Sequence, residues 1–351
     1  MKLFQRKRAR TRRSEDSHYA YPLCRENNRT FPESFDGFVC IWDIDKTYLE
    51  SDIDSLRGLL KIPFEFAIDK RTVPGADNLL RLLRRPKGIR RSNGLYFVSA
   101  SPNQLRHTIE RKMLLDAVEH DGITLKNWTA IVRKRTFAKL REQIGYKLSA
   151  LLLGRKELAA CHREILFGDD SEADALIYTV YADICAGRLR GSFLRSTLLQ
   201  QGVAHEDAHY VDTLCAPLPE RDCVERIFIH IEKEASVSNF DAWNPRLVAC
   251  RDTFQMALML LADDDIDASD LAAQATFLHS EHSVSPEQLR ASIEDLIARK
   301  WLVPLTPSAC SDFMDVLLSG SSRDELAKWT KHIRPAPRSS SDYLTPNTFL
   351  G

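Results

Sequence analysis

The sequence has no excess of either charge, and this absence argues against one broad class of partner. Lysine and arginine together number 49, and so do aspartate and glutamate. A chain whose whole surface binds nucleic acid usually carries a basic excess, so we expect no specific nucleic-acid partner. The N-terminal segment departs from this balance through a basic cluster: Lys2, Arg6, Lys7, Arg8, Arg10, Arg12 and Arg13. We expect residues 1–33 to form a basic disordered tail with weak attraction to anionic surfaces.

Long apolar runs are also missing. No stretch approaches the roughly 20 apolar residues that a transmembrane helix needs, and the N-terminus has no apolar segment typical of a secretory signal. The eight cysteines form no Cys-x-x-Cys pair, and several lie in apolar stretches. Reduced, buried thiols are therefore expected. These absences predict a cytoplasmic protein without a transmembrane segment, whose contact with membranes would be peripheral.

What the sequence does contain, from about residue 34, is an alternation of short apolar runs with helical patterns. The apolar runs predict strands at 38–42, 95–98, 164–167 and 226–231. The helical patterns begin near residues 74, 104, 137 and 172. Strands that alternate with helices form a parallel sheet with right-handed crossovers and helices on both faces. The predicted fold class is therefore α/β, with a Rossmann-like parallel sheet.

The alternation ends near residue 250, and helical patterns continue beyond it. Ser285, Pro286 and Gln288 form a capping box with proline at the first helical position. A winged helix over 285–305 is an alternative, but the scarcity of basic residues there favours packing against the main domain. We expect three parts after the N-terminal tail: a catalytic-type α/β domain over 34–250, a helical subdomain over 251–333 and a flexible tail over 334–351.

Polar side chains follow three of the predicted strands at the point where each strand ends. Asp43 and Asp45 follow the first, Ser99 and Ser101 follow the second, and Asp169 and Asp170 follow the third. In an open parallel sheet, ligands bind at the carboxyl ends of the strands. These side chains, far apart in the sequence, are therefore expected to meet in one crevice.

Asp43 and Asp45 are separated by a single residue directly after five apolar residues. Two carboxylates that close repel each other, and their titrations are coupled. A divalent cation relieves the repulsion at one of them, and the other can then hold a proton and act as a general acid or base. An isolated Asp-x-Asp is common in surface turns, but its position after an apolar strand favours a functional site.

Hydroxyl groups and a lysine supply candidates for binding an anion. Thr47 and Ser99 are donors suited to phosphoryl oxygens, and backbone amides from Ala100 onward would favour an anion where a helix begins. Each of these alone is typical of an ordinary turn or cap. Lys147 would supply a fixed cation beside a transferring group, although one lysine is more often solvated and the neighbouring Lys134 and Lys139 are alternatives.

The acidic segment after the third strand supplies candidate metal ligands. Mg²⁺ prefers oxygen ligands, and one or two protein carboxylates are usual. Asp169 ends the strand and is the best candidate, and Asp170 or Asp174 would complete or orient the shell. For Asp170 or Asp174 alone, a solvated acid at a helix start is the commoner alternative.

Taken together and in this order, the motifs resemble the haloacid dehalogenase superfamily. They read Asp43-Ile-Asp-Lys-Thr47, Phe97-Val-Ser99, Lys147 and Gly168-Asp-Asp-Ser-Glu-Ala-Asp174. A closer resemblance, over about residues 36–190, is to the catalytic domain of the actin-patch-associated phosphatidate phosphatases. It is carried by Tyr96-Phe-Val-Ser-Ala-Ser-Pro102, by Tyr146-Lys147, and by Tyr178 four residues after Asp174.

The resemblance implies a Mg²⁺-dependent phosphomonoester hydrolase with an aspartyl-phosphate intermediate. Asp43 would be the nucleophile, Asp45 the general acid and base, and Lys147 a catalytic cation. Thr47, Ser99 and Ala100 would bind the phosphoryl oxygens. The metal would be held by a set of carboxylates: Asp43, Asp45, Asp169, Asp170 and Asp174. The closer resemblance implies phosphatidate as the substrate, converted to diacylglycerol at a membrane surface.

Three positions depart from the closer family pattern. Lys46 stands where the family has a second acid, Asp170 where it has serine, and Ser171 where it has glycine. Because the carboxylates that carry the chemistry are retained, these departures concern the substrate more than the reaction. A phosphoprotein, a polynucleotide or a small metabolite remains an alternative substrate, and a catalytically silent module of the same fold is an alternative of another class.

The short intervals between the motifs predict a minimal cap. Asp43 to Ser99 and Ser99 to Lys147 are largely filled by core strands and helices, which leaves at most a flap over about residues 48–73. A site without a closing lid suits a phosphate on a large object, because nothing closes around a small metabolite to exclude water.

Overall fold

The computed structural model describes most of the chain between residues 20 and 337. The described residues are 20–27, 31, 35–50, 71–85, 93–133, 142–159, 162–171, 173–232, 237, 240 and 243–337. The predicted tails over 1–33 and 334–351 and the predicted flap over 48–73 therefore lie largely outside the described residues. The prediction of a disordered tail is wrong for Leu23–Asn27, which form a strand at the edge of the central sheet. Within the described part, no helix combines the length and the apolar character needed to cross a bilayer.

A seven-stranded sheet forms the centre of the described part. Its spatial order is β1-β6-β5-β2-β7-β8-β9. The strands are β1 (Leu23–Asn27), β2 (Phe38–Trp42), β5 (Gly94–Pro102), β6 (Gly122–Lys126), β7 (Arg163–Asp169), β8 (Val224–His230) and β9 (Leu247–Cys250). Only the edge strand β1 is antiparallel to its neighbour. The predicted α/β class is confirmed, and β1, β6 and β9 join the four predicted strands.

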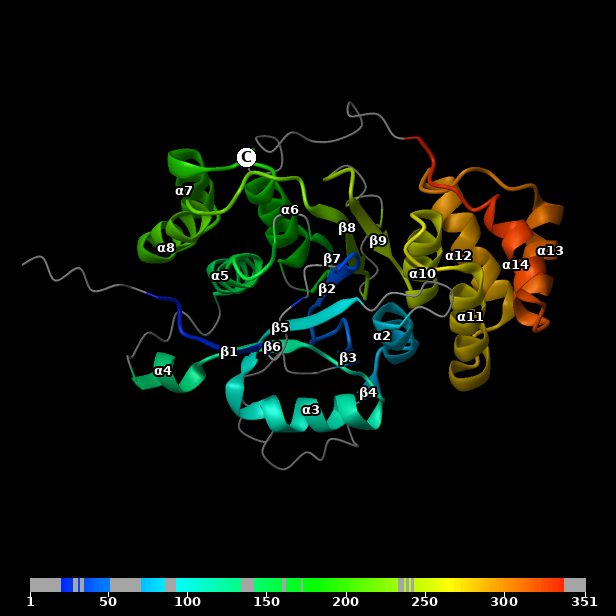
Figure 1. The fold of residues 1–351 in the computed structure, drawn as a ribbon, viewed down its shortest axis with the longest axis horizontal. Coiled ribbons are helices and arrows are strands. Elements are labelled where there is room, and N and C mark those ends of the chain that lie inside the picture. Colours follow the sequence, from blue (N-terminus) through cyan, green and yellow to red (C-terminus); the bar gives the residue numbers. More distant parts are fainter. Residues whose placement is uncertain are drawn as a thin grey trace, which may run out of the picture.

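The two faces of the sheet bury different residues of the same strand. Phe38, Cys40 and Trp42 of β2 point into one core, and Val39 and Ile41 point into the other, as the two-residue period of a strand requires. The helices on the second face are α5 (Ile144–Arg155), α6 (Asp174–Cys185), α7 (Gly191–Gln200) and α8 (His205–Cys215). The first face is covered by α2 (Ala76–Arg84), α3 (Arg106–Leu115) and α10 (Thr253–Ala262). Figure 1 shows the resulting three layers.

The helices predicted from the sequence are present, but some of them begin at later residues than predicted. The helix expected from residue 104 begins as a short 3₁₀ turn at Asn103–Leu105 before α3, and that expected from residue 172 begins at Asp174. The helix expected from residue 137 is α5, which begins at Ile144, after residues that are not described. A small hairpin, β3 (Leu49–Glu50) with β4 (Arg71–Thr72), forms the described base of the predicted flap.

The C-terminal helices pack against the first face of the sheet through α10. After α10 come α11 (Ala268–His282), α12 (Pro286–Ala298), α13 (Pro307–Leu318) and α14 (Arg323–Thr330). The Ser285 capping box is present, with the Ser285 hydroxyl accepting from the Gln288 amide and the Gln288 side chain accepting from the Ser285 amide. Phe254 and Leu258 of α10 belong to the same core as Trp42 of β2. The helical region therefore shares a continuous apolar core with one face of the sheet.

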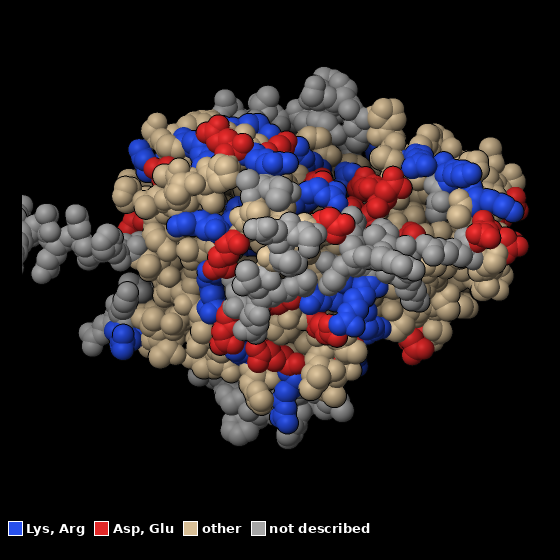
Figure 2. Space-filling model, viewed as in Figure 1, with Lys and Arg blue, Asp and Glu red and all other residues tan. Residues whose placement is uncertain are grey.

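Charges of both signs are interspersed on the surface in the view of Figure 2. This mixture agrees with the balanced composition and shows no broad patch of one sign on that face. Each of the seven cysteines among the described residues is free of a disulfide, and six of them are buried, as the sequence predicts.

Hydrogen bonds join the start of α2, at Pro74 and Gly75, to the C-terminal helices. The sequence predicts that α2 begins at this point. Gly75 precedes α2 with a φ of 76°. The Gln274 side-chain amide donates to the Gly75 carbonyl at 3.0 Å, and the Thr253 hydroxyl donates to the Pro74 carbonyl at 2.8 Å. A Cβ atom at Gly75 would lie 2.6 Å from both the Gln274 and Thr253 polar atoms. Glycine is therefore required here by conformation and by space.

We expect Gly75→Ala to lower the free energy of unfolding by about 2–4 kcal/mol, because backbone strain and overlap with a packed neighbour add. Gly202→Ala is the matched control, since Gly202 has a φ of +77° and open space around its Cβ position. It should cost only about 1–2 kcal/mol from the backbone. Chemical denaturation of both variants gives the comparison, and equal losses would contradict the proposed steric role.

Candidate active site

The topology brings the predicted site to the carboxyl edge of the three central strands. β5 and β7 flank β2, and the sheet continues outward from them in opposite directions. This is the point of a parallel sheet at which strand order reverses and ligands bind. Asp43 follows β2, Ser99 lies near the end of β5, and Asp169 ends β7; all three are buried. The predicted convergence is therefore present.

Lys147 lies between two buried carboxylates. Its Nζ atom is 2.9 Å from Asp43 Oδ1 and 2.5 Å from Asp174 Oδ1, and the side chains of all three residues are at most 1% exposed. The Asp43 backbone amide donates to the Phe167 carbonyl at 2.8 Å, which fixes the start of the loop after β2. Of the lysines weighed from the sequence, Lys147 is thus in the site, and Lys134 and Lys139 lie outside the described residues.

Asp43, Asp169 and Asp174 form a compact acidic cluster. One carboxylate oxygen of each lies within 4.8 Å of the others, and all three residues are buried. With the three carboxylates ionised (−3) and the Lys147 ammonium (+1), the formal charge of the group is −2. Three oxygen ligands with this charge fit a hard divalent cation. Gly168 allows the close approach, because a Cβ there would lie 2.4 Å from Asp174 Oδ2.

Asp45 points toward β5 and is held by two serines. Its Oδ2 atom accepts hydrogen bonds from the Ser99 hydroxyl at 2.9 Å and the Ser101 hydroxyl at 2.7 Å. The Ser101 amide donates to Ser99 Oγ at 2.9 Å, and the Tyr146 hydroxyl donates to the Ser99 carbonyl at 2.5 Å. Ser101, which the sequence places with Ser99 at the end of this strand, thus contacts Asp45 directly.

The remaining predicted residues lie around this centre in different environments. Thr47 is buried, and its hydroxyl has no hydrogen-bond partner among the described residues. The Ala100 carbonyl accepts from Trp128 Nε1 at 3.2 Å. The Asp170 carboxylate is directed to β8, where it accepts from the Glu232 amide at 3.0 Å. Asp45 and Asp170 are therefore not part of the three-carboxylate cluster.

Asp169 is oriented by Ser171. The Ser171 amide donates to Asp169 Oδ1 at 2.6 Å, and the Ser171 hydroxyl donates to the same oxygen. Tyr178 lies behind the cluster and donates to the Phe167 carbonyl at 3.2 Å. Burial and the Asp174 carboxylate raise the pKa of Tyr178 well above its usual range, so the phenol stays neutral and serves as a donor.

Lys46 occupies a left-handed conformation at the rim of the site, with a φ of 61°. Its carbonyl is hydrogen-bonded to His230 Nδ1 at 3.0 Å, and its Nζ atom lies 3.1 Å from Glu232 Oε2. His230 and Glu232, which end β8 and follow it, were not predicted from the sequence. Polar residues at the carboxyl ends of parallel strands are expected to lie close together. The same argument, applied to β8, would have predicted His230 and Glu232 near the site.

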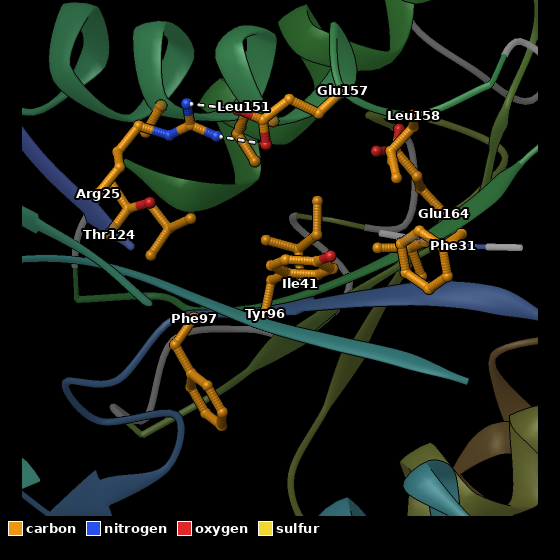
Figure 3. A pocket seen from close by; sticks show the side chains of 14 residues that line it. Arg25, Phe31, Ile41, Tyr96, Phe97, Thr124, Leu151, Glu157, Leu158 and Glu164 are labelled. Carbon is orange, nitrogen blue, oxygen red and sulfur yellow. Dashed lines mark hydrogen bonds and ion pairs between the residues drawn. The ribbon is translucent and has the colours of Figure 1, made fainter. Parts of the chain in front are cut away.

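A pocket lies elsewhere, between α5 and the second face of the sheet (Figure 3). Its walls include Ile41, Tyr96 and Leu151, and the Arg25–Glu157 ion pair lies at one side. None of the predicted site residues lines it. The candidate active site is thus defined by its side chains and not by this pocket.

Comparisons with known proteins find a family model that matches part of the chain. A family model described as phosphatidate phosphatase APP1, catalytic domain, matches residues 38–196. The matched segment contains Asp43, Ser99, Lys147, Asp169 and Asp174. No curated protein and no solved structure matches the chain.

Proposed function

We propose that this protein converts phosphatidate to diacylglycerol with Mg²⁺ and an aspartyl-phosphate at Asp43. The proposal is supported by the match of residues 38–196 to the phosphatidate phosphatase APP1 catalytic domain, a domain that hydrolyses phosphoric monoesters. The observation that carries this proposal is the buried Asp43–Lys147–Asp174 group beside Asp169. A carboxylate held rigidly by a buried cation at the end of a central strand is suited to in-line attack on phosphorus.

The proposed metal ligands are Asp43, Asp169 and Asp174. Their three oxygen donors and the formal charge of the group fit Mg²⁺, which takes few protein carboxylates and keeps several waters. When bound, Mg²⁺ supplies positive charge next to the phosphoryl oxygens. This is a narrower set than the five carboxylates expected from the sequence, because Asp45 is hydrogen-bonded to Ser99 and Ser101, and Asp170 to the Glu232 amide.

Asp43 is proposed to form a bond to phosphorus as the bond between phosphorus and the diacylglycerol oxygen breaks. Lys147 holds one Asp43 oxygen by charge, so the carboxylate needs little reorganisation before attack. Asp45 gives a proton to the leaving alkoxide and later takes one from the water that hydrolyses the aspartyl-phosphate. The Ser99 and Ser101 hydroxyls fix Asp45 for both transfers.

Thr47 is the side chain best suited to donate a hydrogen bond to a phosphoryl oxygen. Its buried hydroxyl has no partner among the described residues, and an unpaired buried hydroxyl is costly unless a ligand completes it. The Ser99 hydroxyl, by contrast, already donates to Asp45. We therefore assign Thr47, with backbone amides near Ala100, to the phosphoryl group, and Ser99 to the placement of Asp45.

A substrate panel tests the proposal. Vesicles containing phosphatidate, a soluble aryl phosphate, a phosphopeptide and a 5′-phosphorylated oligonucleotide would each be incubated with the purified protein. We expect phosphate release to be fastest from the vesicles, to fall at least about 100-fold in EDTA, and to return when Mg²⁺ is added in excess. A faster reaction with any other substrate would reject phosphatidate, and unchanged activity in EDTA would reject the metal.

A further inference from the structure

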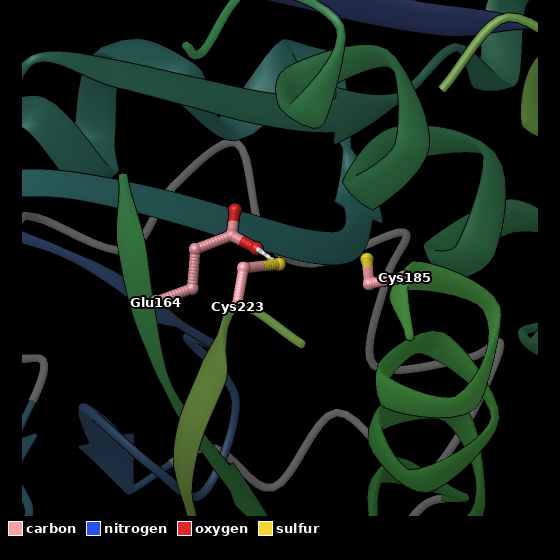
Figure 4. Close-up of side chains that lie close together, drawn as sticks. All are labelled: Glu164, Cys185 and Cys223. Carbon is pink, nitrogen blue, oxygen red and sulfur yellow. Dashed lines mark hydrogen bonds between the residues drawn. The ribbon is translucent and has the colours of Figure 1, made fainter. Parts of the chain in front are cut away.

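A second group of metal-ligating side chains lies at the other end of β7 and α6. Glu164 is the second residue of β7, Cys223 directly precedes β8, and Cys185 ends α6. A carboxylate oxygen and the two sulfur atoms all lie within 4.8 Å of one another. Figure 4 shows Glu164 and Cys223 side by side, with Cys185 facing them from α6. All three residues are at most 3% exposed.

The chemistry of this group is unusual for an apolar core. Cys223 Sγ donates to Glu164 Oε2 at 3.5 Å, and the Tyr181 hydroxyl donates to the same oxygen at 2.8 Å. The other oxygen, Glu164 Oε1, is buried without a hydrogen-bond partner among the described residues. The adjacent Cys185 thiol and burial raise the pKa of Cys223, and burial raises that of Glu164. A buried carboxyl oxygen without a partner is a site at which a ligand would be stabilising.

We propose that Glu164, Cys185 and Cys223 bind a structural Zn²⁺ ion. Thiolate sulfur and carboxylate oxygen are zinc ligands, whereas Mg²⁺ avoids sulfur. On binding, each thiol loses its proton to solvent, so that one Zn²⁺ replaces two protons. A water molecule or the second carboxylate oxygen completes the usual four ligands.

The charges around the group balance when the ion is present. Two thiolates and one carboxylate carry −3, Zn²⁺ carries +2, and Arg155, whose Nη1 atom is 3.7 Å from Glu164 Oε2, adds +1. The sum is zero, which a buried site requires. The Tyr181 hydroxyl would orient the ligating carboxylate from outside, as hydrogen-bond donors around metal sites commonly do.

We expect an ion to reach the group through the pocket beneath α5. Glu164 is one of the residues that line this pocket (Figure 3). Arg25 and Glu157, paired at 3.0 Å at one side of it, are 18% and 49% exposed. An entry path is one of the features expected of a real metal site.

The proposed zinc site and the proposed catalytic cluster lie at opposite ends of the same strand, β7, and the same helix, α6. Zinc binding would therefore affect the catalytic cluster. β7 carries Glu164 near one end and Asp169 at the other, and α6 runs from Asp174 to Cys185. An ion that joins Glu164 to Cys185 would therefore fix α6 against β7. That in turn would hold Asp174 in place beside Asp169.

Metal analysis of the purified protein tests this proposal without using activity. Protein prepared without chelators should contain about one zinc per chain, and Cys223→Ser should contain about a tenth of that or less. Cys215→Ser is the matched control, because Cys215 is another buried free cysteine that lies outside the group. It should keep its zinc. Replacement of zinc by Co²⁺ should give a thiolate-to-metal absorption band in the wild type and in Cys215→Ser, and none in Cys223→Ser.

Three results would overturn the proposal. The first is wild-type protein that retains no zinc after incubation with ZnCl₂ and gel filtration, and the second is equal zinc content in the wild type and Cys223→Ser. The third is a disulfide-linked peptide pair containing Cys185 and Cys223 in a non-reducing digest of the protein as purified. If Cys223→Ser does not fold, the Co²⁺ spectrum of the wild type decides alone, since a spectrum without the thiolate band excludes cysteine ligands.

Discussion

Asp43→Asn is expected to reduce kcat for phosphate release by at least about 1,000-fold, since an amide cannot form the acyl-phosphate bond. The replacement has nearly the same shape, and Lys147 keeps its contact with Asp174 at 2.5 Å. The fold should therefore persist. Removal of one of three neighbouring carboxylates also relieves repulsion, so the melting temperature in EDTA should equal or exceed that of the wild type.

The control for this prediction is Asp212→Asn. Asp212 lies on α8, paired with Arg195, and is 18% exposed, so the same chemical change is made far from the proposed nucleophile. Its kcat should stay within about a factor of two of the wild type, as is usual for surface changes. Wild-type activity in Asp43→Asn would refute the assignment of the nucleophile, whatever the substrate.

Asp170→Asn tests whether Asp170 is a metal ligand. The sequence places Asp170 among five carboxylate ligands, whereas the ligand set proposed from the structure leaves it out. The Asp170 carboxylate accepts from the Glu232 amide and lies outside the cluster of Asp43, Asp169 and Asp174. An asparagine oxygen can accept the same hydrogen bond. The Mg²⁺ concentration needed for half-maximal activity should therefore change less than about threefold, whereas Asp169→Asn should raise it at least about tenfold.

The sequence predicts which side chains meet at the carboxyl edge of the sheet, because the signal that marks them is local. An apolar strand followed at once by a polar residue marks a carboxyl strand end, and parallel strands bring their carboxyl ends to one edge. Asp43, Ser99 and Asp169 each follow this pattern. Their mutual closeness needed no knowledge of which strands are neighbours, only that the sheet is parallel.

Orientation and long-range pairing are not encoded in such patterns. Asp45 could have faced the cluster of Asp43, Asp169 and Asp174 or faced β5, and in the structure it is hydrogen-bonded to the Ser99 and Ser101 hydroxyls of β5. The same holds for Glu164, which sits within an apolar strand pattern and meets Cys185 and Cys223 through the packing of α6 and β8. Strands β1 and β6 mix apolar with polar residues, and β9 has only four residues, so none of them shows the run of five apolar residues that marks β2.

Lys147→Met should have the largest effect on stability, and that effect should depend on Mg²⁺. Lys147 is the cation between Asp43 and Asp174, and its side chain is fully buried. Loss of one partner from a buried ion pair typically costs about 3–5 kcal/mol, and here two carboxylates lose their counter-charge. In EDTA we expect a loss of that size in the free energy of unfolding. With saturating Mg²⁺ the loss should shrink by at least about 1 kcal/mol, because the ion supplies part of the missing charge.

Lys126→Met distinguishes this effect from the general cost of removing a buried lysine. Lys126 is also 0% exposed, but its ammonium donates to the Glu142 backbone carbonyl. Its replacement should destabilise the protein equally in EDTA and in Mg²⁺. Chemical denaturation of both variants under both conditions gives four free energies. If Lys147→Met loses the same stability with and without Mg²⁺, Lys147 does not balance the charge of a metal-binding cluster, and the proposed ligand set of Asp43, Asp169 and Asp174 fails with it.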